Sequence, residues 1–165
     1  MIQNELLSNI VGEQKPELIK GYPRSENEIQ YKLNELSDRI SPTNPPEAGF
    51  LGIGIDGHIA GIFNVVGTDS IQESFLIHKR EDDPYQRVTI SMHILEVIPN
   101  LVFFVTGHGK KPVLTGVLSS RLKDQLTPIS YLLNNGKGGK TIICDRSAAP
   151  DQFPLGETFF SQDST

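Results

Sequence analysis

Apolar residues recur along this chain at two spacings, one typical of helices and one typical of strands. Near the N-terminus, residues 4–11 show the helical spacing. A second helix is predicted to begin at Ser25, because Ser25 and Glu28 form the pattern of a capping box. Its apolar stripe consists of Ile29, Leu33, Leu36 and Ile40. Three prolines within residues 41–46 predict that a loop follows this helix.

From residue 74 onward, short strands alternate with short helices. Strands are predicted at 74–78, 87–92, 101–105 and 140–144, with helical segments at 94–98, after 110 and at 128–133. Val88, Ile90 and Met92 are expected on the buried side of the second strand, and an exposed charged loop is expected at 79–86. The uninterrupted apolar run 101–105 predicts a central buried strand. The helix after Lys110 is expected to bury Val113, Leu114, Val117 and Leu118. This alternation predicts an α/β fold.

Residues 50–64 are the stretch around which the rest is organised. Phe50 and Leu51 are predicted to end a buried strand, and the glycines that follow permit a tight turn. A helix is expected next, because apolar residues recur at helical spacing at Ile59, Ile62 and Phe63. Asp56 and His58 would then lie at the carboxyl end of a strand, where open α/β sheets bind their ligands.

The same glycines fit two alternatives. Gly52, Gly54 and Gly57 match the literal dinucleotide fingerprint, which also requires a firm strand, a good helix and an acid about twenty residues further on. Here the expected helix contains Gly61, and the acids arrive only at 81–83, so an NAD site is less favoured. The other alternative is a tight turn whose aspartate and histidine are simply solvated.

Two places on the chain suggest chemistry. A carboxylate beside His58 orients the imidazole and suits it to act as a general base near neutral pH, whereas no Gly-x-Ser-x-Gly elbow occurs. The glycine-containing turn 106–110 precedes a helix and carries Lys110, a combination that attracts anions. Lys111 stands beside Lys110, and Arg87 is a third cation expected to converge there. His78 and His93 are interpreted as packing or surface residues, and the histidine spacing predicts no metal site.

Composition narrows the class of protein. The 165 residues predict a single domain, 1–165, with a loosely ordered tail at 150–165. A net charge of −5 without a basic cluster argues against a nucleic-acid partner. The one cysteine, Cys144, is interpreted as a small buried residue in a reducing compartment. With no signal peptide and no apolar run of membrane-spanning length, no membrane partner is expected and the predicted location is cytoplasmic.

Together these segments resemble the family of 6-phosphogluconolactonases and glucosamine-6-phosphate deaminases. Residues 51–63 look like its Leu-Gly-x-Gly-x-Asp-Gly-His-x-Ala-x-Leu-Phe signature, and 106–110 are similar to its Thr-Gly-x-x-Lys turn. The segment 87–91 resembles the lactonase Arg-Ile-Thr-Leu-Thr sequence. The closing Pro-x-Ser and Asp-x-x-Ala segments resemble 128–130 and 144–149, so the match runs from about Met1 to about Ala149.

The resemblance implies a Rossmann-like, open and mainly parallel sheet flanked by helices. The implied reaction is hydrolysis of 6-phospho-D-glucono-1,5-lactone in the pentose phosphate pathway, without a cofactor. His58 would activate water and Asp56 would orient it, while the substrate-binding residues would be Lys110, Arg87, Gly54 and Gly57. A deaminase is the alternative, although its catalytic glutamate would stand at the position of Phe63.

Family members also carry an N-terminal section before the matching part. It contains a first strand, a Gly-Gly-Ser/Thr phosphate loop and an Asp-Glu-Arg motif, none of which this chain shows. The resemblance therefore implies an N-terminally truncated chain with weak activity. Its sheet edges would be exposed and able to self-associate. The third alternative is a non-catalytic fragment that binds sugar phosphates or another chain.

Overall fold

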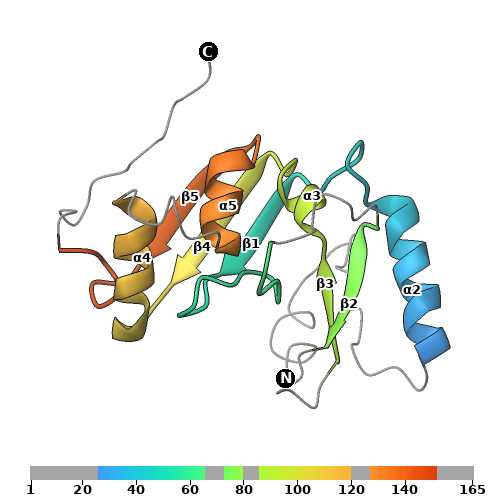
Figure 1. Ribbon diagram of the computed structural model, residues 1–165. Coiled ribbons are helices and arrows are strands. Elements are labelled where there is room, and N and C mark those ends of the chain that lie inside the picture. The colour runs from blue at the N-terminus through green and yellow to red at the C-terminus, as the bar shows by residue number, and fades with distance from the viewer. Residues whose placement is uncertain (1–25, 66–72, 80–85, 120–126, 152–165) are drawn as a thin grey trace, which may run out of the picture. The chain divides into compact units, whose positions relative to one another are not determined.

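The computed structural model describes residues 26–65, 73–79, 86–119 and 127–151 (Figure 1). The chain divides into two compact units, Met1–Lys32 and Leu33–Thr165, and most of the described residues belong to the second. Several predictions lie outside the described residues, namely the helix at 4–11, the capping residue Ser25, most of the charged loop and most of the tail. That one domain extends over the whole chain stays a prediction.

The predicted second helix is confirmed as α2, Glu26–Arg39. Its apolar stripe is the least exposed part of its surface: Leu33 is buried, and Leu36 and Ile40 are half-buried. The side chain of Asn44, in the turn that follows, donates a hydrogen bond to the carbonyl of Arg39 at 2.7 Å. This bond satisfies one of the carbonyl groups that the end of a helix leaves without a partner.

Three parallel strands form the sheet that carries the candidate site. They are β1 (Ala48–Gly52), β4 (Asn100–Val105) and β5 (Gly139–Cys144), in the order β1-β4-β5. The register pairs Gly52 with Phe104 and Val105 with Cys144, so the three carboxyl ends reach the same edge. The predicted α/β fold and the central place of the apolar run are therefore confirmed.

Three short helices cover one face of this sheet. They are α3 (Met92–Leu95), α4 (Lys111–Leu118) and α5 (Pro128–Asn135). Their apolar residues join the inward side chains of β4 in one core, which includes Leu95, Leu101, Phe103, Val105, Leu114 and Ile129. The expected buried face of α4 is correct at Val113 and Leu114 but wrong at Leu118. That residue ends the helix and is 38% exposed.

On the opposite face of the sheet, the described strands expose apolar side chains. Phe50 is 69% exposed, and it stacks on the exposed ring of Phe104 with the ring centroids 6.2 Å apart. Ile143, which pairs with Phe104 in the register, is also exposed. The prediction that these strands are buried is therefore correct for one face only. An apolar run does not tell whether one or both faces of a strand are covered.

A separate two-stranded hairpin connects the sheet strands β1 and β4 in the sequence. Its strands are β2 (Phe75–Lys79) and β3 (Gln86–Ile90), which confirms the predicted strands to within two residues. The predicted inward side is wrong at Val88, which is 49% exposed and pairs with the exposed Ile77. It is correct at Met92, which is buried, and at Ile90, which is half-buried against the core. Thr89 is the buried residue, because its hydroxyl contacts the turn described next.

Candidate active site

The segment after β1 is a compact turn and not the predicted helix. Ile59 forms isolated antiparallel bridges with both Ile53 and Ile62. Between Ile59 and Ile62, Ala60 and Gly61 have φ values of 50° and 78°, as in the two-residue hairpin turns that need two positive φ angles. Ile59 and Ile62 are both buried, three positions apart, because the hairpin folds them together. Without a helix here, the context of a dinucleotide fingerprint is absent as well.

Asp56 and His58 form a hydrogen-bonded pair within this turn. Nδ1 of His58 lies 2.6 Å from Oδ1 of Asp56, and the backbone N–H of His58 donates to the same oxygen at 3.3 Å. Gly57 separates the two residues with a φ of 82°, which L side chains rarely adopt. The N–H of Gly54 donates to the carbonyl of His58 at 2.8 Å and closes the turn.

Two further residues fix the imidazole ring. A Cβ atom added to Gly54 would lie 2.1 Å from Nδ1 of His58, so the ring packs directly on the glycine backbone. The ring of Phe63 lies on His58 with a centroid distance of 4.5 Å and a tilt of 38°. The side chain of His58 nevertheless remains 35% exposed. Gly54 thus has a packing role, and its contact with substrate stays a prediction.

The environment of Asp56 keeps this carboxyl ionised. Partial burial opposes its ionisation, but the hydrogen bonds and the charge of His58 outweigh burial and hold the pKa of Asp56 below its usual range. An ionised Asp56 accepts a hydrogen bond from Nδ1–H of His58. When the imidazole is neutral, the other ring nitrogen, Nε2, is then the one with a free lone pair, as a general base requires.

Residues from distant parts of the chain hold this turn from outside. The Thr89 hydroxyl donates to the carbonyl of Ala60, and the N–H of Ile129 donates to the carbonyl of Gly57 at 3.1 Å. A Cβ atom on Gly57 would lie 2.8 Å from the Cβ of Thr127, which caps α5 in a capping box with Ser130. Sequence reasoning missed Thr89 and Thr127. For Thr127 a signal was present, since a serine follows it by three residues at a helix start.

The second predicted turn follows β4 and begins α4 as expected. It contains Gly107, with a φ of 94°, and a short 3-10 helix, His108–Lys110. A Cβ atom on Gly109 would lie 3.8 Å from Cγ2 of Ile55, so this turn adjoins the turn of Asp56 and His58. The structure therefore brings the two predicted halves of the site together.

Lys110 and Lys111 differ in their partners. The ammonium of Lys111 forms an ion pair with Asp151 at 2.5 Å. Lys110 is half-buried, and no described residue forms a hydrogen bond or an ion pair with its ammonium. Of the two lysines, Lys110 is therefore the one that the described part of the chain leaves for an anionic ligand.

Arg87 lies on the hairpin, on β3 and outside the sheet of three parallel strands. It is exposed and stands two positions before Thr89, so the two side chains share the strand face that contacts Ala60. Its strand thus touches the His58 turn, while the convergence of Arg87 with Lys110 stays a prediction.

The remaining candidates take no part in this arrangement. His93 is half-buried and its Nδ1 has no described hydrogen-bond partner, while Cys144 is half-buried and packs on the core. Within the described ranges, no three His, Cys, Asp or Glu side chains gather as metal ligands would. No helix among the described residues is long and apolar enough to cross a membrane.

Compared with known protein families, residues 1–143 match the family described as glucosamine-6-phosphate isomerases/6-phosphogluconolactonase. The chain belongs to this family. The match extends over both turns of the site and ends within β5. It agrees with the resemblance that the motifs predicted.

Individual members of the family are distant from this chain. A probable 6-phosphogluconolactonase from Dictyostelium discoideum is 30% identical over 112 residues, covering 66% of this chain and 48% of the relative. A 6-phosphogluconolactonase from Helicobacter pylori (strain J99) is 29% identical over 118 residues, which are 70% and 52% of the two chains. The crystal structure of a 6-phosphogluconolactonase from Thermotoga maritima is 26% identical, with a TM-score of 0.54 over 72% of this chain and 50% of that one. The chain thus spans about half the length of the curated relatives it matches.

Proposed function

We propose that this chain hydrolyses 6-phospho-D-glucono-1,5-lactone to 6-phosphogluconate, the lactonase reaction of the pentose phosphate pathway. The observation that carries the proposal is the contact of 2.6 Å between Asp56 and His58 at the carboxyl end of β1. Hydrolysis of this phosphorylated lactone needs a base that activates water and a site that binds the phosphate group. This edge of the sheet offers a candidate for each. Its relatives named as 6-phosphogluconolactonases support the choice of substrate.

In the proposed reaction, Nε2 of His58 removes a proton from a water molecule as its oxygen attacks the lactone carbonyl carbon. Asp56 accepts the hydrogen bond from Nδ1–H and stabilises the imidazolium that forms. When the tetrahedral intermediate collapses, the bond between the carbonyl carbon and the ring oxygen breaks. The imidazolium returns its proton to that oxygen, which becomes the hydroxyl group of the product. No cofactor is required for this sequence.

The phosphate group of the substrate is proposed to bind at Lys110. This lysine adjoins a turn rich in glycine at the start of α4, where backbone N–H groups and the helix dipole favour an anion. Arg87 is the second proposed phosphate ligand, and Gly54 and Gly57 would line the sugar. Binding at a site remote from the carbonyl converts phosphate affinity into correct placement of the lactone.

Phe63 argues for a lactonase over a deaminase. A deaminase of this family would place a catalytic glutamate at this position, whereas here an aromatic ring covers one side of His58. An uncharged ring keeps water and a second carboxylate away from that side of the base. We also propose that the chain acts as a single enzymatic domain in the cytoplasm, which fits this metabolic role.

The test is hydrolysis of freshly generated 6-phosphogluconolactone by the purified chain and its His58→Ala variant, each corrected for the uncatalysed rate. We expect turnover that the substitution lowers at least about 100-fold, the usual scale for losing a general base. Unchanged turnover in the variant would refute His58 as the base. Turnover at background in both proteins would favour a non-catalytic fragment that binds sugar phosphates or associates through its sheet edges. Ammonia released from glucosamine 6-phosphate would instead identify a deaminase.

A further inference from the structure

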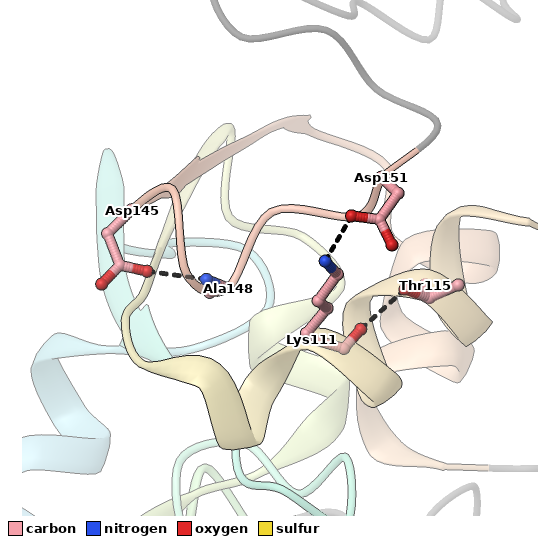
Figure 2. Close-up of polar contacts among 5 residues, drawn as sticks. All are labelled: Lys111, Thr115, Asp145, Ala148 and Asp151. Carbon is pink, nitrogen blue, oxygen red and sulfur yellow. Dashed lines mark hydrogen bonds and ion pairs between the residues drawn. The ribbon is translucent and has the colours of Figure 1, made fainter.

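The loop that follows β5 is joined to the turn that carries Lys110 at two points. Asp145, the first residue of this loop, reaches back to Gly107, and Asp151 pairs with Lys111 at the start of α4. Figure 2 shows Asp151 against Lys111, and Asp145 with its bond to Ala148 on the same loop. The proposed reaction assigns no role to either aspartate.

The carboxylate of Asp145 is saturated with hydrogen bonds. The N–H of Gly107 donates to both of its oxygens at 3.1 Å. The N–H of Ala148 and the hydroxyl of Ser147 donate to one oxygen each, both at 2.9 Å. These bonds, led by that from Ala148, hold the pKa of Asp145 below its usual range. The carboxylate is thus a fixed connector between the end of β5 and the end of β4.

The residue that Asp145 holds determines the course of the turn. Gly107 has a φ of 94° and is the residue at which the chain leaves β4 and enters the 3-10 helix His108–Lys110. Its carbonyl accepts the N–H of Lys110 at 3.0 Å, so Gly107 is linked to Asp145 through its N–H and to Lys110 through its carbonyl. On the far side of Lys110, Lys111 is fixed by Asp151 and by the Thr115 hydroxyl, which donates to its carbonyl at 2.8 Å.

We propose that Asp145 is a positioning residue for the phosphate subsite: it fixes Gly107, and through this residue the approach of Lys110 to the phosphate group. This inference rests on the proposed function, because it specifies how that site recognises a phosphorylated substrate. Asp145 itself does not touch the ligand.

The sign of the expected effect separates positioning from simple electrostatics. A carboxylate near an anion site repels the anion, so neutralising it should strengthen phosphate binding if charge alone mattered. If Asp145 positions the turn, Asp145→Asn weakens binding, because an amide offers one acceptor oxygen where the carboxylate serves donors with two. The two views predict opposite outcomes for one substitution.

The experiment measures the Kd of 6-phosphogluconate by titration calorimetry, with gluconate as the ligand that lacks the phosphate, for the full chain and its variants. We expect Asp145→Asn to raise the Kd of 6-phosphogluconate about fivefold or more, as the loss of charge-assisted hydrogen bonds at an exposed site would. In lactone hydrolysis the same variant should raise KM and leave kcat within about twofold. Asp38→Asn, which removes an exposed carboxylate from α2, is the matched control for charge.

Lys110→Ala separates this inference from the function on which it rests. If Lys110→Ala leaves the Kd of 6-phosphogluconate unchanged, the phosphate subsite is wrong and the positioning role falls with it. If Lys110→Ala weakens binding but Asp145→Asn does not, only the role of Asp145 is overturned. Should Asp145→Asn fail to fold, Ser147→Ala removes one donor while keeping the carboxylate. It should then weaken 6-phosphogluconate about twofold, and equal affinity would refute the inference.

Discussion

Replacing Gly54 with alanine places a methyl group where the imidazole ring of His58 now lies. The added Cβ atom would be 2.1 Å from Nδ1 and 2.3 Å from Cε1 of His58, and 2.5 Å from Oδ1 of Asp56. Ordinary van der Waals contact begins at 3.4 Å, so the ring must move by about 1.3 Å. The Asp56–His58 hydrogen bond, only 2.6 Å long, does not survive such a displacement without a matching movement of Asp56.

The magnitude follows from the cost of misplacing a catalytic group. A shift of about 1 Å lowers rates roughly 100-fold, equivalent to about 2.7 kcal/mol of transition-state stabilisation. We therefore expect Gly54→Ala to lower kcat/KM for lactone hydrolysis about 100-fold. Gly54 is not among the residues with positive φ, so the backbone itself accepts alanine and the loss is expected in activity more than in folding.

The assay compares Gly54→Ala with Gly52→Ala, a control two residues earlier on the same chain segment. A Cβ atom on Gly52 would meet only the carbonyl oxygen of Phe104, at 4.0 Å, so this variant should retain wild-type turnover. Thermal unfolding of each variant checks that the chain remains folded. Wild-type activity in Gly54→Ala, in a chain that loses activity with His58→Ala, would refute the packing of the imidazole on Gly54.

Two further predictions concern stability. Ala60 has a φ of 50°, a strained conformation for a residue with a side chain. Ala60→Gly should release this strain and raise the free energy of unfolding by about 0.5–1 kcal/mol after the entropy cost of glycine. Chemical denaturation measures this free energy, and a value below that of the wild type would contradict the prediction. Asp56 and Asp145 both have a lowered pKa in the folded chain. Each therefore contributes stability that is fully present above the unfolded pKa of about 3.9 and is lost as pH falls through the folded pKa. Unfolding measured from pH 6 to pH 2 should therefore depend less on pH in Asp145→Asn than in wild type, and equal dependence would exclude the contribution of Asp145.

The sequence carried enough information for the strands and for the edge at which the site lies. An apolar run such as that in β4 identifies a central strand, and glycines with an aspartate and a histidine after β1 identify a candidate ligand-binding turn. The prediction of a helix after His58 is wrong, because two apolar residues three positions apart, such as Ile59 and Ile62, can meet in a hairpin as well as in a helix. The hairpin differs from a helix by the positive φ of Ala60, and the sequence does not indicate this conformation because Ala60 is not a glycine.

The long-range contacts that hold the two turns of the candidate site could not be predicted from the sequence, for a different reason. Thr89, Ile129 and Asp145 lie far along the chain from the peptides that they hold, namely those of Ala60, Gly57 and Gly107. Local spacing reports on neighbours within one element, whereas these pairs meet only after the strands have assembled. Each of these contacts ends on a backbone group.

That choice of partner has a chemical consequence. Because the anchors hold carbonyl and N–H groups of the two turns, they leave Nε2 of His58 and the ammonium of Lys110 without a hydrogen-bond partner among the described residues and available to a ligand. A substitution at Thr89 or Asp145 should accordingly change the positions of the His58 and Lys110 side chains without removing either of them. Its effect should appear as altered placement of the substrate, whereas substitution of His58 would remove the proposed base itself.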